Sequence, residues 1–290
     1  MKKYLWATLV LVVAVISTVI GYQRCQKPLV SVVMLTYKRA DIVPRAIDSI
    51  LAQTFKDFEF IILNDGSPDN TDEVIEKYVK KDSRIRYYKN DQNRGISYSR
   101  NRAASLARGK YVAIMDDDDE SLPERLQKQV EFMEKHPDVT TVATQIKGLP
   151  RVPLNHDDIA TGLIQYNNFG NSNTMYKREF QKRNNVKYDP GLKASEDWKF
   201  WLQMLFSGAK FATLDEDLHI RHGDSIKHYG ISYEEANAPI REYVAQFFSP
   251  SNPQAFYTAS ACDKLKMIAK APTKIFSQSY LDSLLATNCF

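Results

Sequence analysis

The chain has 290 residues, enough for one large domain or two small ones. Hydrophobic residues make up 43% and charged residues 26%, which excludes a disordered chain, a collagen-like fibre and a protein with many membrane spans. The net charge is only +4, whereas a nucleic-acid binder usually carries a larger, clustered basic excess, so we expect no nucleic-acid partner. The three cysteines predict neither a disulfide framework nor a CxxC metal site.

An uncharged run of eighteen residues lies near the N-terminus, from Tyr4 to Gly21. As a helix it would be about 27 Å long, which is just enough to cross a bilayer core. A cleaved signal peptide normally has a shorter apolar region and a small-x-small cleavage site, which this run matches poorly. We therefore expect residues 1–27 to be a single-pass membrane anchor, with a cleaved signal or a buried helix as alternatives. Basic residues flank both ends and leave the orientation undecided.

From Pro28 on, short apolar runs alternate with amphipathic stretches. We predict strands over 29–35, 58–63, 85–88 and 111–115, and helices after Asp41, over 71–80, over 97–107 and over 123–135. Asp41 is expected to cap the first of these helices and Gly109 to end the third. Four strand–helix repeats predict an α/β fold with a doubly wound, mostly parallel sheet flanked by helices.

The rest of the chain is less regular. Residues 145–190 are expected to hold loops and short strands, and another helix is expected to open at Ser195. We divide the chain into the segment 1–27, a single catalytic domain over 28–228 and a helical C-terminal extension over 229–290.

Polar clusters follow three of the predicted strands, at residues 36–39, 64–67 and 116–119. Because the carboxyl ends of parallel strands meet at one edge of a sheet, these clusters are expected to converge on one cleft. The chain contains no GxGxxG and no GxxxxGK[ST] motif, so the Rossmann dinucleotide and P-loop modes of binding are unsupported.

The run of four aspartates from Asp116 to Asp119 is the sharpest chemical signal. Adjacent carboxylates repel one another, and a hard divalent cation such as Mg²⁺ or Mn²⁺ would offset that repulsion. The alternative is a solvated acidic loop that caps the next helix. An EF-hand is excluded, because Ser121 stands where that loop requires glycine.

Three further groups carry weaker signals. Asp65 lies in an Asn-Asp-Gly-Ser turn and is either a plain turn residue or a contact for a nucleotide base. The acidic pair Glu196–Asp197 opens a helix, where the dipole favours acids, or supplies a general base. Arg221 and His222 lie in a polar loop that could close on a diphosphate, although a lone histidine is more often structural.

Together these segments resemble family 2 glycosyltransferases, which have the GT-A fold. The resemblance covers about residues 28–228 and rests on six ordered motifs: residues 30–39, 49–55, 63–67, 93–101, 115–119 and 196–198. Their spacing is also similar to that of a spore-coat polysaccharide glycosyltransferase. Asn64 departs from the family's usual "DDGS" turn, and the "QxxRW" motif of processive members is absent.

The resemblance implies a role for each matching residue. Thr36, Arg39 and Asp65 would hold the nucleoside, Asn93 and either Arg94 or Arg100 would approach the base or the phosphates, and Arg221 would contact the phosphates. Asp118 would ligate a Mn²⁺ or Mg²⁺ ion, Asp116 would contact the ribose or the metal, Asp117 would assist, and His222 would contact the metal or a phosphate. Asp197 would be the general base, with Glu196 beside it.

These roles describe a metal-dependent, inverting glycosyltransferase. It would move a sugar from a nucleotide sugar, most simply a UDP-sugar, to a glycan, a lipid-linked acceptor or a protein. The alternatives are a catalytically silent nucleotide- or carbohydrate-binding module on a membrane and a sugar nucleotidyltransferase. Neither the transferred sugar nor the acceptor follows from the sequence.

Overall fold

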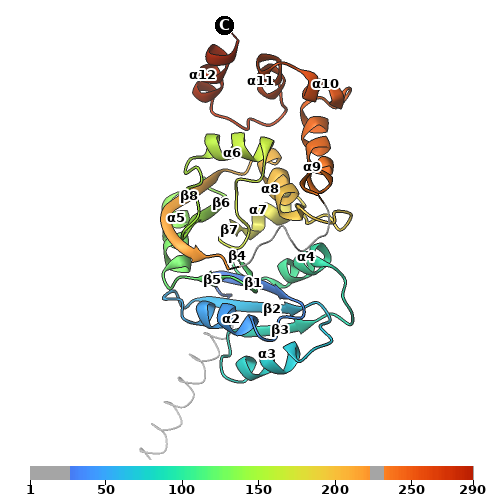
Figure 1. The fold of residues 1–290 in the computed structure, drawn as a ribbon. Helices are drawn as coiled ribbons and strands as arrows, with labels where there is room; N and C mark the ends of the chain where they lie inside the picture. Colours follow the sequence, from blue (N-terminus) through green and yellow to red (C-terminus); the bar gives the residue numbers. More distant parts are fainter. Residues whose placement is uncertain (1–26, 223–231, 290) are drawn as a thin grey trace, which may run out of the picture.

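The computed structural model describes residues 27–222 and 232–289. Its centre is an eight-stranded mixed sheet with the strand order β3-β2-β1-β4-β7-β6-β8-β5. Helices cover both faces of this sheet (Figure 1). The predicted α/β architecture is therefore confirmed.

The first half of the sheet is parallel and matches the predicted alternation. Its elements are β1 (Val30–Thr36), α2 (Val43–Leu51), β2 (Phe58–Asn64), α3 (Thr71–Val79), β3 (Ile85–Lys89), α4 (Ile96–Leu106) and β4 (Tyr111–Asp116). β1 lies between β2 and β4, with Thr36 opposite Asn64 and Leu35 opposite Asp116. The register thus brings the ends of all three strands to one edge of the sheet.

Two local predictions in this half were wrong. The residue before α2 is Ile42, with no side-chain cap, so Asp41 does not cap the helix. α4 ends at Leu106, before Gly109. A Cβ on Gly109 would lie 2.6 Å from the backbone nitrogen of Ser31, so this glycine permits a close approach of the chain to β1.

The second half of the sheet is mixed. It contains β5 (Glu120–Ser121), α5 (Arg125–Lys135), β6 (Thr141–Ile146), α6 (His156–Gln165), β7 (Met175–Lys177), α7 (Arg178–Arg183), α8 (Glu196–Phe206) and β8 (Phe211–Ile220). β7 is antiparallel to β4 and β6, whereas β8 is parallel to β6. α6 was not predicted. It begins where Asn155 accepts a hydrogen bond from the backbone N–H of Asp158.

Each face of the sheet has its own hydrophobic cluster. One cluster is formed with α2, α3 and α5 and includes Ile47, Ile75 and Val130. The other is formed with α4, α6 and α8 and includes Trp198 and Trp201, both buried. The site described below lies on the sheet edge that these two layers hold in place.

The C-terminal part is helical, as predicted, with α9 (Tyr233–Phe248), α10 (Pro253–Thr258), α11 (Ala261–Ala269) and α12 (Gln278–Asn288). In Figure 1, α10, α11 and α12 lie at the top of the molecule above α6, and α9 runs down from them beside α8. Phe248, Phe276 and Leu281 belong to the same hydrophobic cluster as Trp201, so the extension shares the core of the catalytic domain. A capping box at Ser232 and Glu235 begins α9.

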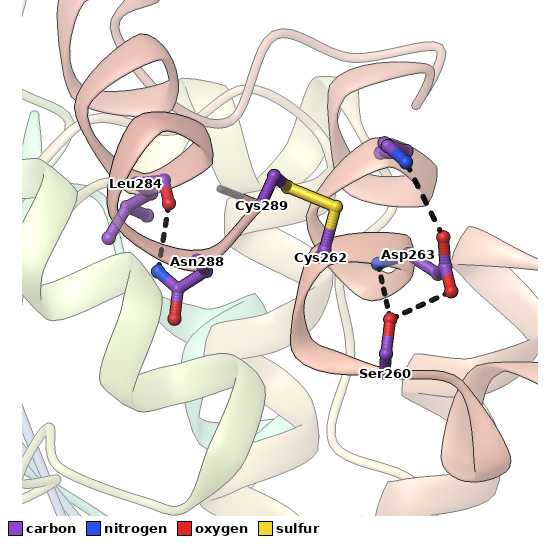
Figure 2. The surroundings of a disulfide bond; sticks show 7 residues. Ser260, Cys262, Asp263, Leu284, Asn288 and Cys289 are labelled. Carbon is purple, nitrogen blue, oxygen red and sulfur yellow. Dashed lines mark hydrogen bonds and ion pairs between the residues drawn. A yellow bond between two sulfur atoms is a disulfide. The ribbon is translucent and has the colours of Figure 1, made fainter.

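A disulfide that the sequence analysis did not predict joins the last two helices. Cys262 of α11 is bonded to Cys289, directly after α12 (Figure 2). On the other side of Cys262, Ser260 caps α11 by accepting from the backbone N–H of Asp263. The bond closes a stretch with a sequence separation of 27 residues and ties the two helices together.

The predicted membrane anchor over 1–27 falls almost wholly outside the described residues. Within residues 27–222 and 232–289, no helix combines the length and the apolar character needed to span a membrane.

Candidate functional site

A cleft of about 510 Å³ opens at the carboxyl ends of β1 and β4. Eight of the predicted site residues line it: Arg39, Arg100, Asp116, Asp117, Asp118, Glu196, Asp197 and Arg221. Two of the three polar clusters, around residues 36–39 and 116–119, therefore meet, as the parallel register of β1 and β4 predicts.

The aspartate run forms one end of this cleft. Arg39 lies 3.6 Å from the carboxylate of Asp118, and Arg45 of α2 donates to its backbone carbonyl at 2.7 Å. Asp116, the last residue of β4, is 3.3 Å from the guanidinium of Arg100. Two arginines thus pair with two different carboxylates of the run.

The charge of this cluster is only partly compensated. Asp116 and Asp117 keep some surface open to the cleft, but burial of the carboxyl groups among protein atoms raises the pKa of Asp116 to about 6 and that of Asp117 to about 7. Arg100 opposes the shift at Asp116, and the neighbouring aspartates add to it by repulsion. Such a cluster favours the binding of a cation.

Asp119 has a different environment from its three neighbours. It is buried, and Nε2 of His219 lies 2.9 Å from its carboxylate, while Ser172 donates a second hydrogen bond. Burial alone would raise the pKa of Asp119, but these hydrogen bonds, with one from the backbone of His222, outweigh it and lower the pKa. Asp119 therefore anchors the acidic loop. Ser172 and His219 belong to no local motif, so the sequence does not indicate them as site residues.

Arg100 joins the acidic loop to α8. It pairs with Glu196 at 2.5 Å and lies 5.3 Å above the ring of Tyr188. Burial would lower the pKa of Arg100, but Glu196 and Asp116 outweigh it and raise the pKa. Glu196 is only 4% exposed. Glu196 therefore holds Arg100 in place, and a part of Glu196 in catalysis beside Asp197 stays a prediction.

Asp197 faces the cleft from the first turn of α8. Its two carboxylate oxygens accept from the backbone N–H of Trp198 at 2.7 Å and from the side-chain amide of Asn167 at 3.2 Å. Ser195, the residue before the helix, has a left-handed backbone with φ of 59°. Its hydroxyl donates to Asn237 of α9 at 2.8 Å. The C-terminal extension therefore holds the turn that presents Asp197.

Asp65, the predicted nucleoside contact on the Asn64–Ser67 turn, does not line the cleft. Asp65 is buried and accepts hydrogen bonds from the side chain of Asn90 and from the backbone of Arg94 and Gly95. These contacts fix the loop before α4. Gly66 has φ of 70°, and a Cβ there would meet the backbone of Gln92 at 2.4 Å. A direct contact of Asp65 with a base stays a prediction.

Thr36, Asn93 and Arg94 also lie outside the residues that line the cleft, and they differ in exposure. Asn93 and Arg94 are exposed on the loop before α4, where Arg94 stacks over Tyr98 at 4.7 Å. The hydroxyl of Thr36 is buried beside Asp117 and lowers the pKa of that carboxyl, but it does not reach hydrogen-bond geometry with any described residue. A ligand that enters this corner would find an unsatisfied hydroxyl.

The predicted metal ligands Asp116, Asp118 and His222 do not gather into one site. Nε2 of His222 lies 3.3 Å from Glu120, and the described residues hold no cluster of three His, Cys, Asp or Glu side chains suited to a metal. The donor set nevertheless fits a hard divalent ion, because such an ion often takes only one or two carboxylates and completes its shell with substrate phosphates. The raised pKa values of Asp116 and Asp117 indicate that the protein stabilises these negative charges poorly, and a bound cation would stabilise them.

The family model "Glycosyl transferase family 2" matches residues 31–206. A Methanocaldococcus jannaschii protein named as an uncharacterized glycosyltransferase is 37% identical over 205 residues, which cover 66% of this chain and 70% of that protein. The Escherichia coli protein named UDP-Glc:alpha-D-GlcNAc-diphosphoundecaprenol beta-1,3-glucosyltransferase WfaP is 29% identical over 194 residues, with coverage of 63% and 72%.

Two solved structures have the same fold at low identity. S. aureus TarS 1-349 in complex with UDP-GlcNAc aligns with a TM-score of 0.66 at 20% identity, covering 91% of this chain and 72% of TarS. The mannosyltransferase PcManGT from Pyrobaculum calidifontis, in complex with GDP-Man and Mn²⁺, aligns with a TM-score of 0.59 at 17% identity, covering 91% and 80%. This likeness supports the expected GT-A architecture of the described residues.

Proposed function

The chain belongs to glycosyl transferase family 2, and from this premise we propose that it is a metal-dependent, inverting enzyme that uses a nucleotide sugar, with a UDP-sugar as the favoured donor. The observation that carries the proposal is the single cleft that both the acidic run and Asp197 line. The E. coli relative is named for UDP-Glc and a diphosphoundecaprenol-linked acceptor. From the name of this relative and from the family, we infer that the acceptor of this chain is a glycan, a lipid-linked sugar or a protein.

Asp118, with Asp116 beside it, would hold Mn²⁺ or Mg²⁺ together with the donor diphosphate. When bound, the ion supplies positive charge that offsets the charge gained by the departing nucleoside diphosphate. Arg39 and Arg221 also line this part of the cleft and would bind the phosphates. The orphan hydroxyl of Thr36 would hydrogen-bond the nucleoside.

Asp197 is the proposed general base. A hydroxyl of the acceptor loses its proton to a carboxylate oxygen of Asp197, and its oxygen bonds to the anomeric carbon while the bond from that carbon to the phosphate breaks. Because the attack comes from the face opposite the leaving group, the configuration inverts. The hydrogen bonds from Trp198 and Asn167 hold the carboxylate in one orientation for this step.

Localisation is proposed from the N-terminal sequence alone. We propose that residues 1–27 anchor the enzyme at a membrane, so that a lipid-linked or surface acceptor would lie within reach. Sodium carbonate extraction of membranes tests this. The full chain should stay in the pellet, and release into the supernatant would contradict an anchor.

The enzymatic test is release of nucleoside diphosphate from UDP-glucose, UDP-N-acetylglucosamine and GDP-mannose with Mn²⁺. Asp197→Asn keeps the size of the side chain but removes the base, and should lower turnover about 10²- to 10⁴-fold with little change in donor KM. The exposed Asp138, which pairs with Lys210 and does not line the cleft, provides the matched control Asp138→Asn. Wild-type turnover by Asp197→Asn would exclude the assigned base. Pyrophosphate release from a nucleoside triphosphate would instead indicate a nucleotidyltransferase.

A further inference from the structure

The segment 166–172 between α6 and β7 forms a wall of the cleft. Tyr166, Asn167, Phe169, Gly170, Asn171 and Ser172 all line it. Side chains near the two ends of this segment contact the two ends of the proposed reaction site: Asn167 donates to Asp197, and Ser172 donates to Asp119. The segment therefore runs past the place where the acceptor hydroxyl must meet the anomeric carbon.

Tyr166 is unusual among the residues of this wall. Its side chain is 50% exposed, the largest exposed fraction among the exposed large hydrophobic residues of the described chain. Its backbone is fixed, because its N–H donates to the carbonyl of Gly162 at 2.7 Å at the end of α6. An exposed aromatic ring on an anchored backbone, lining the cleft directly before Asn167, offers a face on which a ligand can stack.

Apart from Phe169 and Gly170, the rest of the wall consists of uncharged polar residues. Asn171 is 7% exposed and lines the cleft, yet its Nδ2 has no hydrogen-bond partner among the described residues. Asn237 of α9 also lines the cleft. A buried amide donor without a partner costs free energy that a ligand hydroxyl would recover.

An aromatic face next to neutral amides matches the chemistry of a sugar ring. A pyranose carries C–H groups on one face, which are attracted to the negative face of an aromatic ring, and hydroxyls around its rim, which pair with amides. A phosphate would instead require cations along this wall, and a long acyl chain would require a continuous apolar surface.

We infer that the 166–172 segment is the acceptor subsite, and that Tyr166 is the platform on which a sugar ring of the acceptor lies with one hydroxyl directed at Asp197. This inference rests on the proposed function and narrows it, since it names a glycoside as the group that receives the sugar. Tyr166 would then help to determine which acceptor the enzyme uses. The family match alone assigns no ligand to this segment.

The test uses the full chain with Mn²⁺ and the donors named above. Nucleoside diphosphate release is measured without acceptor, and then with methyl glycosides of glucose, galactose, mannose and N-acetylglucosamine. At least one glycoside should accelerate the release. Tyr166→Ala should raise the KM for that glycoside about three- to tenfold, the effect expected from losing an aromatic contact. Donor KM and acceptor-free release should stay unchanged.

Two variants separate binding from misfolding. Tyr166→Phe keeps the ring and should keep the wild-type KM for the glycoside. Tyr257→Ala removes another exposed tyrosine, on α10 and outside the residues that line the cleft, and should change neither KM. The inference is overturned if Tyr166→Ala keeps the wild-type acceptor KM, if it changes both KM values equally, or if donors are hydrolysed but no glycoside accelerates release. No release from any donor would contradict the proposed function itself.

Discussion

The two halves of the chain contribute to the cleft by different means. Apart from Arg100 on α4, the functional side chains that residues 27–146 place in the cleft lie at or just after the ends of parallel strands, so the register of β1, β2 and β4 determines where they lie. Residues 147–289 place theirs on turns and helix starts that long-range side-chain contacts hold, such as Ser195 with Asn237. The backbone hydrogen bonds of the sheet thus position the functional side chains of the first half. Individual side-chain contacts, which a single substitution can remove, position those of the second half.

The contact expected to matter most for stability is the buried pair that joins the halves, Arg100 with Glu196. In Arg100→Met the carboxylate of Glu196 stays buried without its cation, and the pKa of Glu196, already raised by burial, should rise further. We expect the free energy of unfolding, measured with urea, to fall by about 3–5 kcal/mol.

A second substitution and a control sharpen this prediction. The double variant Arg100→Met with Glu196→Leu should recover much of the loss, because no buried charge is left alone. Arg151 pairs with Asp217 at the surface, so Arg151→Met should cost less than about 1 kcal/mol. Equal losses in Arg100→Met and Arg151→Met would show that the halves are not joined through the buried pair.

The disulfide is the next largest effect and concerns the second half alone. Closing a loop with a sequence separation of 27 residues stabilises a fold by about 3–4 kcal/mol in the chain-entropy model. Reduction with dithiothreitol, or Cys262→Ser, should therefore expose the amides of α11 and α12 to hydrogen exchange while those of β1 and β4 stay protected.

The variant with both Cys262→Ser and Cys289→Ser is the control, because it should exchange in the same way with and without dithiothreitol. Loss of protection in β1 and β4 as well would contradict the separation of the two halves. A wild-type exchange pattern after reduction would show that packing alone holds α12 against α11.

The same difference between the two halves explains which features of the structure could be predicted from the sequence. Except for the two-residue strand β5, the strands and helices from Val30 to Lys135 follow from apolar runs and periodicity, and the acidic loop follows from its place after β4. The Asn64–Ser67 turn was located correctly from its residues. That Asp65 faces the loop before α4, and not the cleft, depends on donors from residues 90–95 that no local pattern reveals.

In the second half, the missed features are those made by pairs of distant residues. Nothing within a few residues of Ser172 or His219 points to Asp119, although they contact it over sequence separations of 53 and 100. The disulfide likewise depends on how α11 packs on α12. α6 alone had a readable signal, since Asn155 followed by Asp157 and Asp158 is typical of a helix start.

The smallest predicted effect concerns the docking of the extension onto α6. Asp157 accepts hydrogen bonds from the backbone and the hydroxyl of Ser277, at the start of α12, and both residues are partly or fully exposed. Asp157→Ala should lower the free energy of unfolding by about 1 kcal/mol, since hydrogen bonds open to water are worth little more. Asp138→Ala, an exposed aspartate on the other half, should change it by less than about 0.5 kcal/mol. If Asp157→Ala instead cost as much as reducing the disulfide, this pair of hydrogen bonds would be the main attachment of the extension, and the buried side chains of Phe276 and Leu281 would contribute less than their burial indicates.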